Sequence, residues 1–227
     1  MNILFLAYRQ WSLEVYPHVA KHPRVKRAVL CKTTAEMMVN LAKEPDAFDF
    51  ILFCGWSDEP VKDVVERIPT FTAHCAADDS YSPGSPIQNQ ILDGIRFTKH
   101  RLVRVGYPEL SLRQYSHEVD LDISGDIGDI FLQLKATCIA LFSMFLYDYP
   151  QLEWKTWPSK SEQRPRRKPS DSCLDKEHLA SWTTRQLYDF MRGLESPYPN
   201  AYIEDEHGRL YFSNTRFKEK AALNDES

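Results

Sequence analysis

The sequence predicts an α/β protein with a Rossmann-like, open and mostly parallel sheet, extended by antiparallel strands and a small C-terminal helix and hairpin. Three observations predict this fold. Apolar runs alternate with helical patterns over the first 75 residues, residues 48–54 are apolar almost throughout, and residues 97–121 alternate between apolar and polar. Strands that are almost entirely apolar are typical of parallel sheets covered by helices on both faces.

The chain opens with a predicted strand, helix and strand. Residues 2–7 form an apolar run typical of a buried strand, and a helical pattern follows from Ser12 to about Lys21. The Ser12 hydroxyl is placed to cap the first turn of that helix. A second strand is predicted near residues 27–31, which completes the repeating unit of a doubly wound sheet.

The same order is repeated in the next segment. Thr33 or Thr34 is expected to cap a second helix, and residues 48–54 form the third strand. Residues 61–68 then predict a helix, and residues 70–74 a fourth strand. These elements place three loops at the edge where ligands bind in such sheets.

The pattern changes after the fourth strand. Residues 97–105 and 112–121 predict antiparallel strands, and the apolar residues of 127–147 recur at the spacing of a long, buried helix. Residues 158–169 hold three prolines and no apolar periodicity, as expected of a linker.

A small appendage follows this linker. Residues 183–194 predict a helix, a hairpin is expected around Gly208, and residues 221–227 read as a frayed tail. We therefore divide the chain into an α/β domain, residues 1–150, and a smaller unit, residues 151–227.

Composition excludes several classes of protein. With 28 Lys and Arg against 32 Asp and Glu, the net charge of −4 provides no basic field for a nucleic-acid backbone. The apolar run 2–7 is far shorter than the roughly 20 residues of a membrane span and lacks the features of a signal peptide. Five scattered cysteines form no CxxC pair. We expect a cytoplasmic protein with reduced cysteines, no metal and no nucleic-acid or membrane partner.

The three loops at the ligand edge hold the candidate binding residues. The first contains Tyr8, Arg9 and Trp11 but no glycine, which disfavours a dinucleotide cofactor. The second contains Gly55-Trp56-Ser57, and the third begins at His74. Both tryptophans suit either packing or stacking on a ligand ring.

His74 allows a structural and a catalytic interpretation. A single histidine that ends a buried strand is commonly a hydrogen-bonded structural residue, whereas one at the ligand edge of the sheet can also act on a substrate. Cys75 follows it, but neighbouring residues of a strand point to opposite faces, which argues against a Cys-His pair.

The segment after the fourth strand holds His74, Tyr81, Gly84, Ser85-Pro86-Ile87 and Gly94 in one run. The C-terminal part holds Arg166-Arg-Lys-Pro-Ser-Asp171, then Gln186 to Arg192 and Ser196 to Ala201. In order and spacing, these two segments resemble the formyltransferase family, and specifically the sugar N-formyltransferases related to methionyl-tRNA formyltransferase. Gly55-Trp56-Ser57 also looks like the folate-side loop of this family.

This resemblance implies transfer of a formyl group from 10-formyltetrahydrofolate to the amine of a nucleotide-linked amino sugar, in O-antigen or surface polysaccharide biosynthesis. It further implies a homodimer. The implied catalytic residues are His74, Thr72 and Glu109. The implied cofactor-binding residues are Gly55, Trp56, Ser57 and Ile87, and the implied substrate-binding residues are Tyr8, Arg9, Trp11, Tyr81, Ser85 and Gln88.

The sequence departs from the family pattern at positions where the family has catalytic or substrate-contacting residues. Thr72 stands where the family has an Asn, Ser82 replaces a basic residue, and Glu109 is the only carboxylate in residues 106–111, where the family has an Asp. Two alternatives therefore stay open: a catalytically degenerate binding or regulatory protein, and a formyltransferase acting on another small amine. The appendage is also too short for the tRNA-binding barrel of related tRNA enzymes, which argues against a tRNA acceptor.

Overall fold

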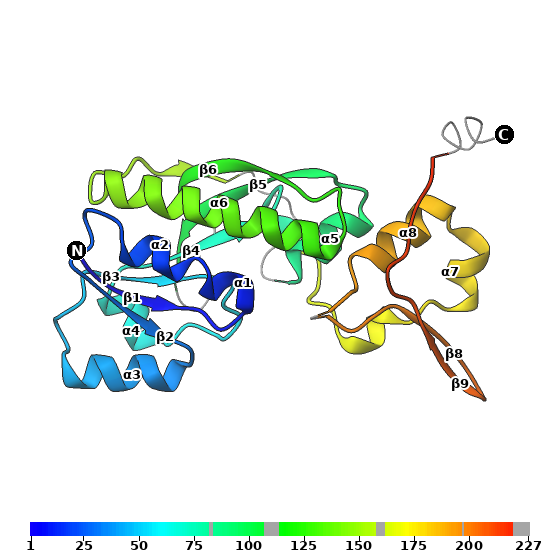
Figure 1. Cartoon of the computed structure of the whole chain (residues 1–227), viewed down its shortest axis with the longest axis horizontal. Helices are drawn as coiled ribbons and strands as arrows, with labels where there is room; N and C mark the ends of the chain where they lie inside the picture. Colours follow the sequence, from blue (N-terminus) through cyan, green and yellow to red (C-terminus); the bar gives the residue numbers. More distant parts are fainter. Residues whose placement is uncertain (82–83, 107–113, 158–161, 197, 220–227) are drawn as a thin grey trace.

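The computed structural model describes residues 1–81, 84–106, 114–157, 162–196 and 198–219 (Figure 1). Within these residues, a seven-stranded sheet has the order β2-β1-β3-β4-β5-β6-β7, and a separate two-stranded sheet pairs β8 with β9. The predicted α/β fold is confirmed.

The first half of the large sheet is parallel. Each of β1, β3 and β4 is joined to its neighbour by parallel hydrogen bonding, and β2 forms the edge. The bounds of these elements are β1 Asn2–Leu6, α1 Gln10–Leu13, α2 Tyr16–Ala20, β2 Arg27–Cys31, α3 Thr34–Lys43, β3 Phe50–Phe53, α4 Lys62–Arg67 and β4 Thr70–Cys75.

The second half of the sheet is antiparallel. The strands β5 (Phe97–Arg104), β6 (Gln114–Asp122) and β7 (Lys155–Thr156) follow β4 in the order of the sheet. In the β4–β5 pair, His74 lies directly opposite Arg101. The register between β5 and β6 shifts at Leu102 and Val103.

Helices cover both faces of the sheet, so the large part has three layers (Figure 1). The long helix α6 (Ile127–Asp148) packs with α1 and α2 on one face, where Phe5, Phe142 and Phe145 are fully buried. Helices α3 and α4 cover the opposite face. Among the described residues, α6 is the one helix long and apolar enough to cross a membrane, but its inward side chains belong to this core, as in many soluble proteins.

The predicted helix from Ser12 to Lys21 is instead two short helices. Ser12 lies inside α1, where its buried side chain donates a hydrogen bond to the Arg9 carbonyl at 2.8 Å. Pro17 occupies the first turn of α2, a position where its missing N–H costs no helical hydrogen bond. By contrast Thr33 caps α3 as expected, since its side chain accepts a hydrogen bond from the Glu36 amide.

Several short helices were not predicted from periodicity. Their bounds are η1 Asp79–Tyr81, α5 Pro86–Leu92, η2 Pro169–Ser172 and α7 Lys176–Ser181. Each is seven residues or shorter, so none holds two full helical periods of apolar residues. Because α5 begins at Pro86, directly after the fourth strand and its loop, it shapes the ligand edge of the sheet.

The appendage consists of α7, α8 (Thr184–Arg192), β8 (Tyr202–Asp205) and β9 (Gly208–Tyr211). Its small core contains Leu174, Phe190, Leu194 and Ala201, and Leu92 of α5 packs against it. The predicted helix and hairpin are therefore both present.

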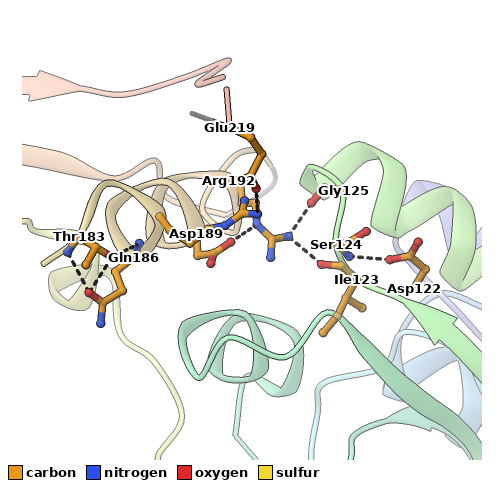
Figure 2. Close-up of polar contacts among 10 residues, drawn as sticks. Asp122, Ile123, Ser124, Gly125, Thr183, Gln186, Asp189, Arg192 and Glu219 are labelled. Atoms are coloured by element: carbon orange, nitrogen blue, oxygen red, sulfur yellow. Dashed lines mark hydrogen bonds and ion pairs between the residues drawn. The ribbon is translucent and has the colours of Figure 1, made fainter. Parts of the chain in front are cut away.

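A buried arginine attaches this appendage to the sheet (Figure 2). Arg192 Nη1 donates hydrogen bonds to the carbonyls of Ile123 at 2.7 Å and Gly125 at 2.6 Å. Its Nε pairs with Asp189 at 2.6 Å, and only 2% of the Arg192 side chain is exposed. Asp122 accepts a hydrogen bond from the Ser124 amide and so orders the turn that presents these carbonyls.

Residues 164–167 form a second connection, which we call the strap. The Arg164 amide donates to the Ser80 carbonyl at 2.6 Å, and the Arg167 amide donates to the Ser85 hydroxyl at 3.1 Å. Asn89 donates to the Pro165 carbonyl at 3.0 Å. The strap therefore lies along the segment that follows β4.

Candidate active site

A cleft of about 520 Å³ lies at the carboxyl ends of β1, β3 and β4, the edge that the sequence predicts. It is closed by α5, α6, the strap and Tyr198. Ten of the thirteen predicted site residues line it, namely Arg9, Trp11, Gly55, Trp56, Ser57, Thr72, His74, Ser85, Ile87 and Gln88. The fold thus brings predicted residues from four separate segments into one space.

The loops after β1 and β3 are joined to each other. The hydroxyls of Tyr8 and Ser57 are 2.6 Å apart, and Arg9 Nε donates to the Gly55 carbonyl at 3.1 Å. Gly55 has φ +61°, and a Cβ there would lie 2.8 Å from the Trp11 ring, so both conformation and space require glycine. Tyr8 packs on Trp56 beside the cleft rather than lining it.

His74 lies at the end of β4, in the wall of the cleft. Its ring stands edge-on to Trp157, with 5.6 Å between ring centroids. The Nε2 atom is buried and has no hydrogen-bond partner among the described residues. Burial, together with the charge of Arg101, lowers the pKa of His74 to about 4. The imidazole is therefore neutral at pH 7.

Thr72 lies two residues before His74 on the same face of β4. Its hydroxyl donates a hydrogen bond to the Phe53 carbonyl at 3.2 Å. Since a hydroxyl has a single proton to donate, this contact leaves Thr72 without a free donor for a ligand oxygen.

An ion pair between a buried arginine and a partly exposed glutamate lies beside His74. Arg101 Nε donates to Glu118 at 3.0 Å, and its Nη1 donates to the Ala76 carbonyl at 2.6 Å. The guanidinium lies over the rings of Trp157, at 4.9 Å, and Tyr115, at 5.1 Å. Sequence analysis missed this group because no pattern in the chain reveals which residues of β5 and β6 stand opposite His74.

The other side of the cleft is aromatic. Trp11 stacks on Phe131 with 6.2 Å between centroids, and Phe131 contacts Tyr198 at 6.1 Å. Trp11 Nε1 and Gln88 Nε2 are buried without a hydrogen-bond partner among the described residues. Phe131 was predicted only as part of the helix core and Tyr198 only as shaping the hairpin, because their proximity depends on the packing of the appendage.

Two predicted residues that the structure describes, Tyr8 and Tyr81, do not line the cleft. Tyr81 is only 5% exposed, and its hydroxyl donates to Asp93 at 2.9 Å, so it supports the segment behind the cleft wall. Arg164 of the strap pairs with the other oxygen of Asp93. Glu109 lies outside the described residues.

A second cavity, of about 680 Å³, lies between the strap and the appendage. Arg164 and Arg167 line it, whereas Gln163 and Arg166 line the cleft. Each pair is three residues apart, the repeat of an extended polyproline II segment. Of the predicted site residues that the structure describes, none lines this cavity. Among the described residues, no group of three or more His, Cys, Asp or Glu side chains could hold a metal ion.

Comparison with known proteins identifies the fold. No family model matches the chain, and no curated protein matches its sequence. The structure is similar to that of methionyl-tRNA formyltransferase from Clostridium thermocellum, with a TM-score of 0.81 and 23% identity, over 96% of this chain and 94% of that one.

The chain has the formyltransferase fold.

Two further structures with this fold extend the comparison. A 4-N formyltransferase from Francisella tularensis matches with a TM-score of 0.72 and 14% identity, over 96% of this chain and 98% of that one. HypX from Aquifex aeolicus in complex with tetrahydrofolic acid matches with a TM-score of 0.67 and 16% identity, over 90% of this chain and 36% of that one.

The length of the C-terminal appendage can be compared with that of the Clostridium protein. The Clostridium protein, described as a methionyl-tRNA formyltransferase, is covered over 94% of its chain by this one. The small appendage therefore does not by itself exclude a tRNA acceptor on the formyltransferase fold.

Proposed function

We propose that this protein is an N-formyltransferase that moves a formyl group from 10-formyltetrahydrofolate to the amine of a nucleotide-linked amino sugar. The observation that carries the proposal is the position of His74: a neutral imidazole with an unpartnered Nε2 stands in the wall of a ligand-sized cleft. The cleft lies at the ligand edge of a formyltransferase fold.

The residues present fit a folate donor. The cleft falls within the roughly 300–1,000 Å³ of small-molecule sites and has aromatic walls suited to a planar ring. The orphaned Trp11 Nε1 and Gln88 Nε2, which belong to the acceptor side, are donors that an oxygen of the sugar substrate would satisfy. We assign Gly55, Trp56, Ser57 and Ile87 to the donor side, and the bound donor supplies an electrophilic formyl carbon.

Neutral His74 provides the proton transfer that this reaction needs. As the amine nitrogen bonds to the formyl carbon, the carbonyl π electrons move to its oxygen, and His74 accepts the proton that the nitrogen loses. When the carbonyl re-forms, the bond to the leaving folate nitrogen breaks, and His74 returns the proton to that nitrogen. Atoms and charges then balance, and His74 ends as it began.

The acceptor side carries the positive charge that a nucleotide diphosphate requires. Arg9 and Arg166 both line the cleft, the first from the loop after β1 and the second from the strap. Guanidinium groups bind phosphate oxygens in bidentate geometry. With Trp11, Ser85 and Gln88, they form the proposed acceptor site. Neighbours described as sugar N-formyltransferases favour the sugar class.

The proposal includes a cytoplasmic homodimer active in O-antigen or surface polysaccharide biosynthesis. Formylation of a set of nucleotide-linked amino sugars tests it directly, with mass spectrometry detecting the added formyl group. His74→Gln should slow product formation on the order of 10²- to 10⁴-fold, while the protein keeps its thermal unfolding temperature at pH 7. A folded wild-type protein that formylates none of these acceptors, while an equal assay with initiator methionyl-tRNA gives product, overturns the sugar assignment.

A second function is favoured by Thr72. Because its hydroxyl donates to the Phe53 carbonyl, it offers no free donor to a developing oxyanion. A formyltransferase-fold protein that binds folate and sugar without turnover is the alternative. Calorimetric binding of tetrahydrofolate, combined with the absence of product for every amine acceptor, would identify that function.

A further inference from the structure

Arg101 is a buried cation placed directly beside the candidate catalytic imidazole. In the antiparallel β4–β5 pair it stands opposite His74, so the two side chains share one face of the sheet. Both side chains also contact Trp157: the His74 ring meets it edge-on at 5.6 Å, and the guanidinium lies over it at 4.9 Å.

The guanidinium cannot move away from this position without losing contacts on several sides. Glu118 holds its Nε, the Ala76 carbonyl holds its Nη1, and Tyr115 packs on its face. Only 6% of the Arg101 side chain is exposed. The positive charge beside His74 is therefore fixed and poorly screened by water.

The other charged groups around His74 leave this positive charge dominant. Glu118 on β6 is committed to Arg101, and Cys75 on β4 is an uncharged thiol because burial raises its pKa to about 12. Trp157 is uncharged. The cleft is also lined by the cations Arg9 and Arg166, by the carboxylates Asp58, Glu59 and Asp79, and by His100 of β5. The charge that lowers the pKa of His74, in addition to burial, is that of Arg101.

We propose that Arg101, held by Glu118, is a positioning residue that keeps His74 neutral and its ring fixed for formyl transfer. His74 is then held as a neutral imidazole, which can take the proton of the attacking amine. Because Arg101 repels the resulting imidazolium, His74 readily returns that proton to the leaving folate nitrogen. The inference rests on the proposed function for its catalytic meaning, but the effect of Arg101 on His74 is a property of the protein alone.

NMR titration of the His74 imidazole in the full-length protein tests this inference. In the wild type we expect a midpoint near 4, as burial and Arg101 dictate. The double variant Arg101→Gln, Glu118→Gln removes both charges and leaves no buried unpaired carboxylate. Its His74 midpoint should rise by roughly one pH unit, and the acidic limb of the pH–rate profile should move with it.

The control pair Lys99→Gln, Asp120→Asn removes an exposed ion pair from the same two strands. It should leave the His74 midpoint unchanged. Arg101→Lys keeps the charge, so its midpoint should stay close to the wild-type value, and activity should recover relative to the double variant. If the double variant does not fold, the His74 midpoints of the wild type and of Arg101→Lys test the inference instead.

A wild-type His74 midpoint at or above pH 6.5 overturns the inference. It would mean that a nearby carboxylate stabilises the imidazolium more than Arg101 destabilises it. So does an unchanged midpoint in the folded double variant. The titration needs no substrate, so it tests the effect of Arg101 on His74 separately from catalysis. If the protein shows the expected midpoints but transfers no formyl group, the proposed function is wrong and the effect of Arg101 on His74 stands.

Discussion

Gly84 lies directly against the main chain of Arg166. A Cβ at residue 84 would lie 2.7 Å from Arg166 Cα and from the Pro165 carbonyl carbon, and closer still to the Arg166 amide nitrogen. These are main-chain atoms, which cannot rotate away as a side chain can. The strap can therefore lie at this position only because residue 84 has no side chain.

Gly84→Ala should displace the strap and lower affinity in the cleft. Overpacking of this kind costs about 1–3 kcal/mol, and we expect weaker binding of tetrahydrofolate by calorimetry together with a lower unfolding temperature. Gly193→Ala is the matched control, since the nearest atom to its Cβ is a side-chain carbon at 3.4 Å. Equal affinities in both variants would show that the strap does not shape the ligand site.

Thr72→Val should have a smaller effect on catalysis than His74→Gln. Removing the bond from Thr72 to the Phe53 carbonyl costs about 1 kcal/mol, which corresponds to less than roughly tenfold in kcat/KM. Loss of the proton acceptor His74 should lower kcat on the order of 10²- to 10⁴-fold. Steady-state kinetics on both variants checks this order, and a Thr72 effect as large as that of His74 would contradict it.

The depressed pKa of His74 makes folding stability depend on pH. Below pH 6.5 the unfolded chain binds a proton at this histidine that the folded protein does not bind until about pH 4. The contribution of His74 to the free energy of unfolding is therefore fully present above pH 6.5. It decreases as the pH drops toward 4, by roughly 3 kcal/mol at most.

Urea unfolding of wild type and His74→Gln across this interval measures the effect. The difference between the two curves isolates His74 from other groups, including His22, whose pKa is also lowered by burial. The wild type should lose more stability on acidification than the variant. Parallel curves would mean that His74 titrates normally in the folded state.

Arg192→Met should loosen the appendage. The substitution leaves Asp189 with a largely buried, unpaired charge and frees the carbonyls of Ile123 and Gly125 (Figure 2). Breaking such a buried pair costs about 3–5 kcal/mol. We expect faster proteolysis in residues 162–183 and a lower unfolding temperature. Arg185→Met, which removes a more exposed pair with Glu219, should behave like the wild type.

The sequence predicted the features that depend on local pattern. The uniformly apolar run at 48–54 matched a parallel strand because burial on both faces leaves a direct trace in composition. The run at 97–105 matched an antiparallel strand, although its residues 100–103 are buried on both faces. The cleft was predicted at the correct edge because parallel strands end together.

Features that depend on pairing between distant segments were missed. Arg101 faces His74 only through the β4–β5 register, and Glu118 stands opposite Arg101 only through the β5–β6 register. Spacing alone also could not show that Tyr81 points toward Asp93 instead of the cleft. Side-chain direction in an irregular segment follows from packing and not from periodicity.

The strap has a consequence for how the chain can be divided. A cut after residue 150 would leave His74 and Trp11 in one fragment but would remove Arg166 and Tyr198, which help to enclose the same cleft. Neither fragment would hold a whole ligand site. A molecule filling the cleft touches both, so its affinity and the affinity of the fragments for each other are thermodynamically linked, and saturating ligand should drive reassembly of the two fragments.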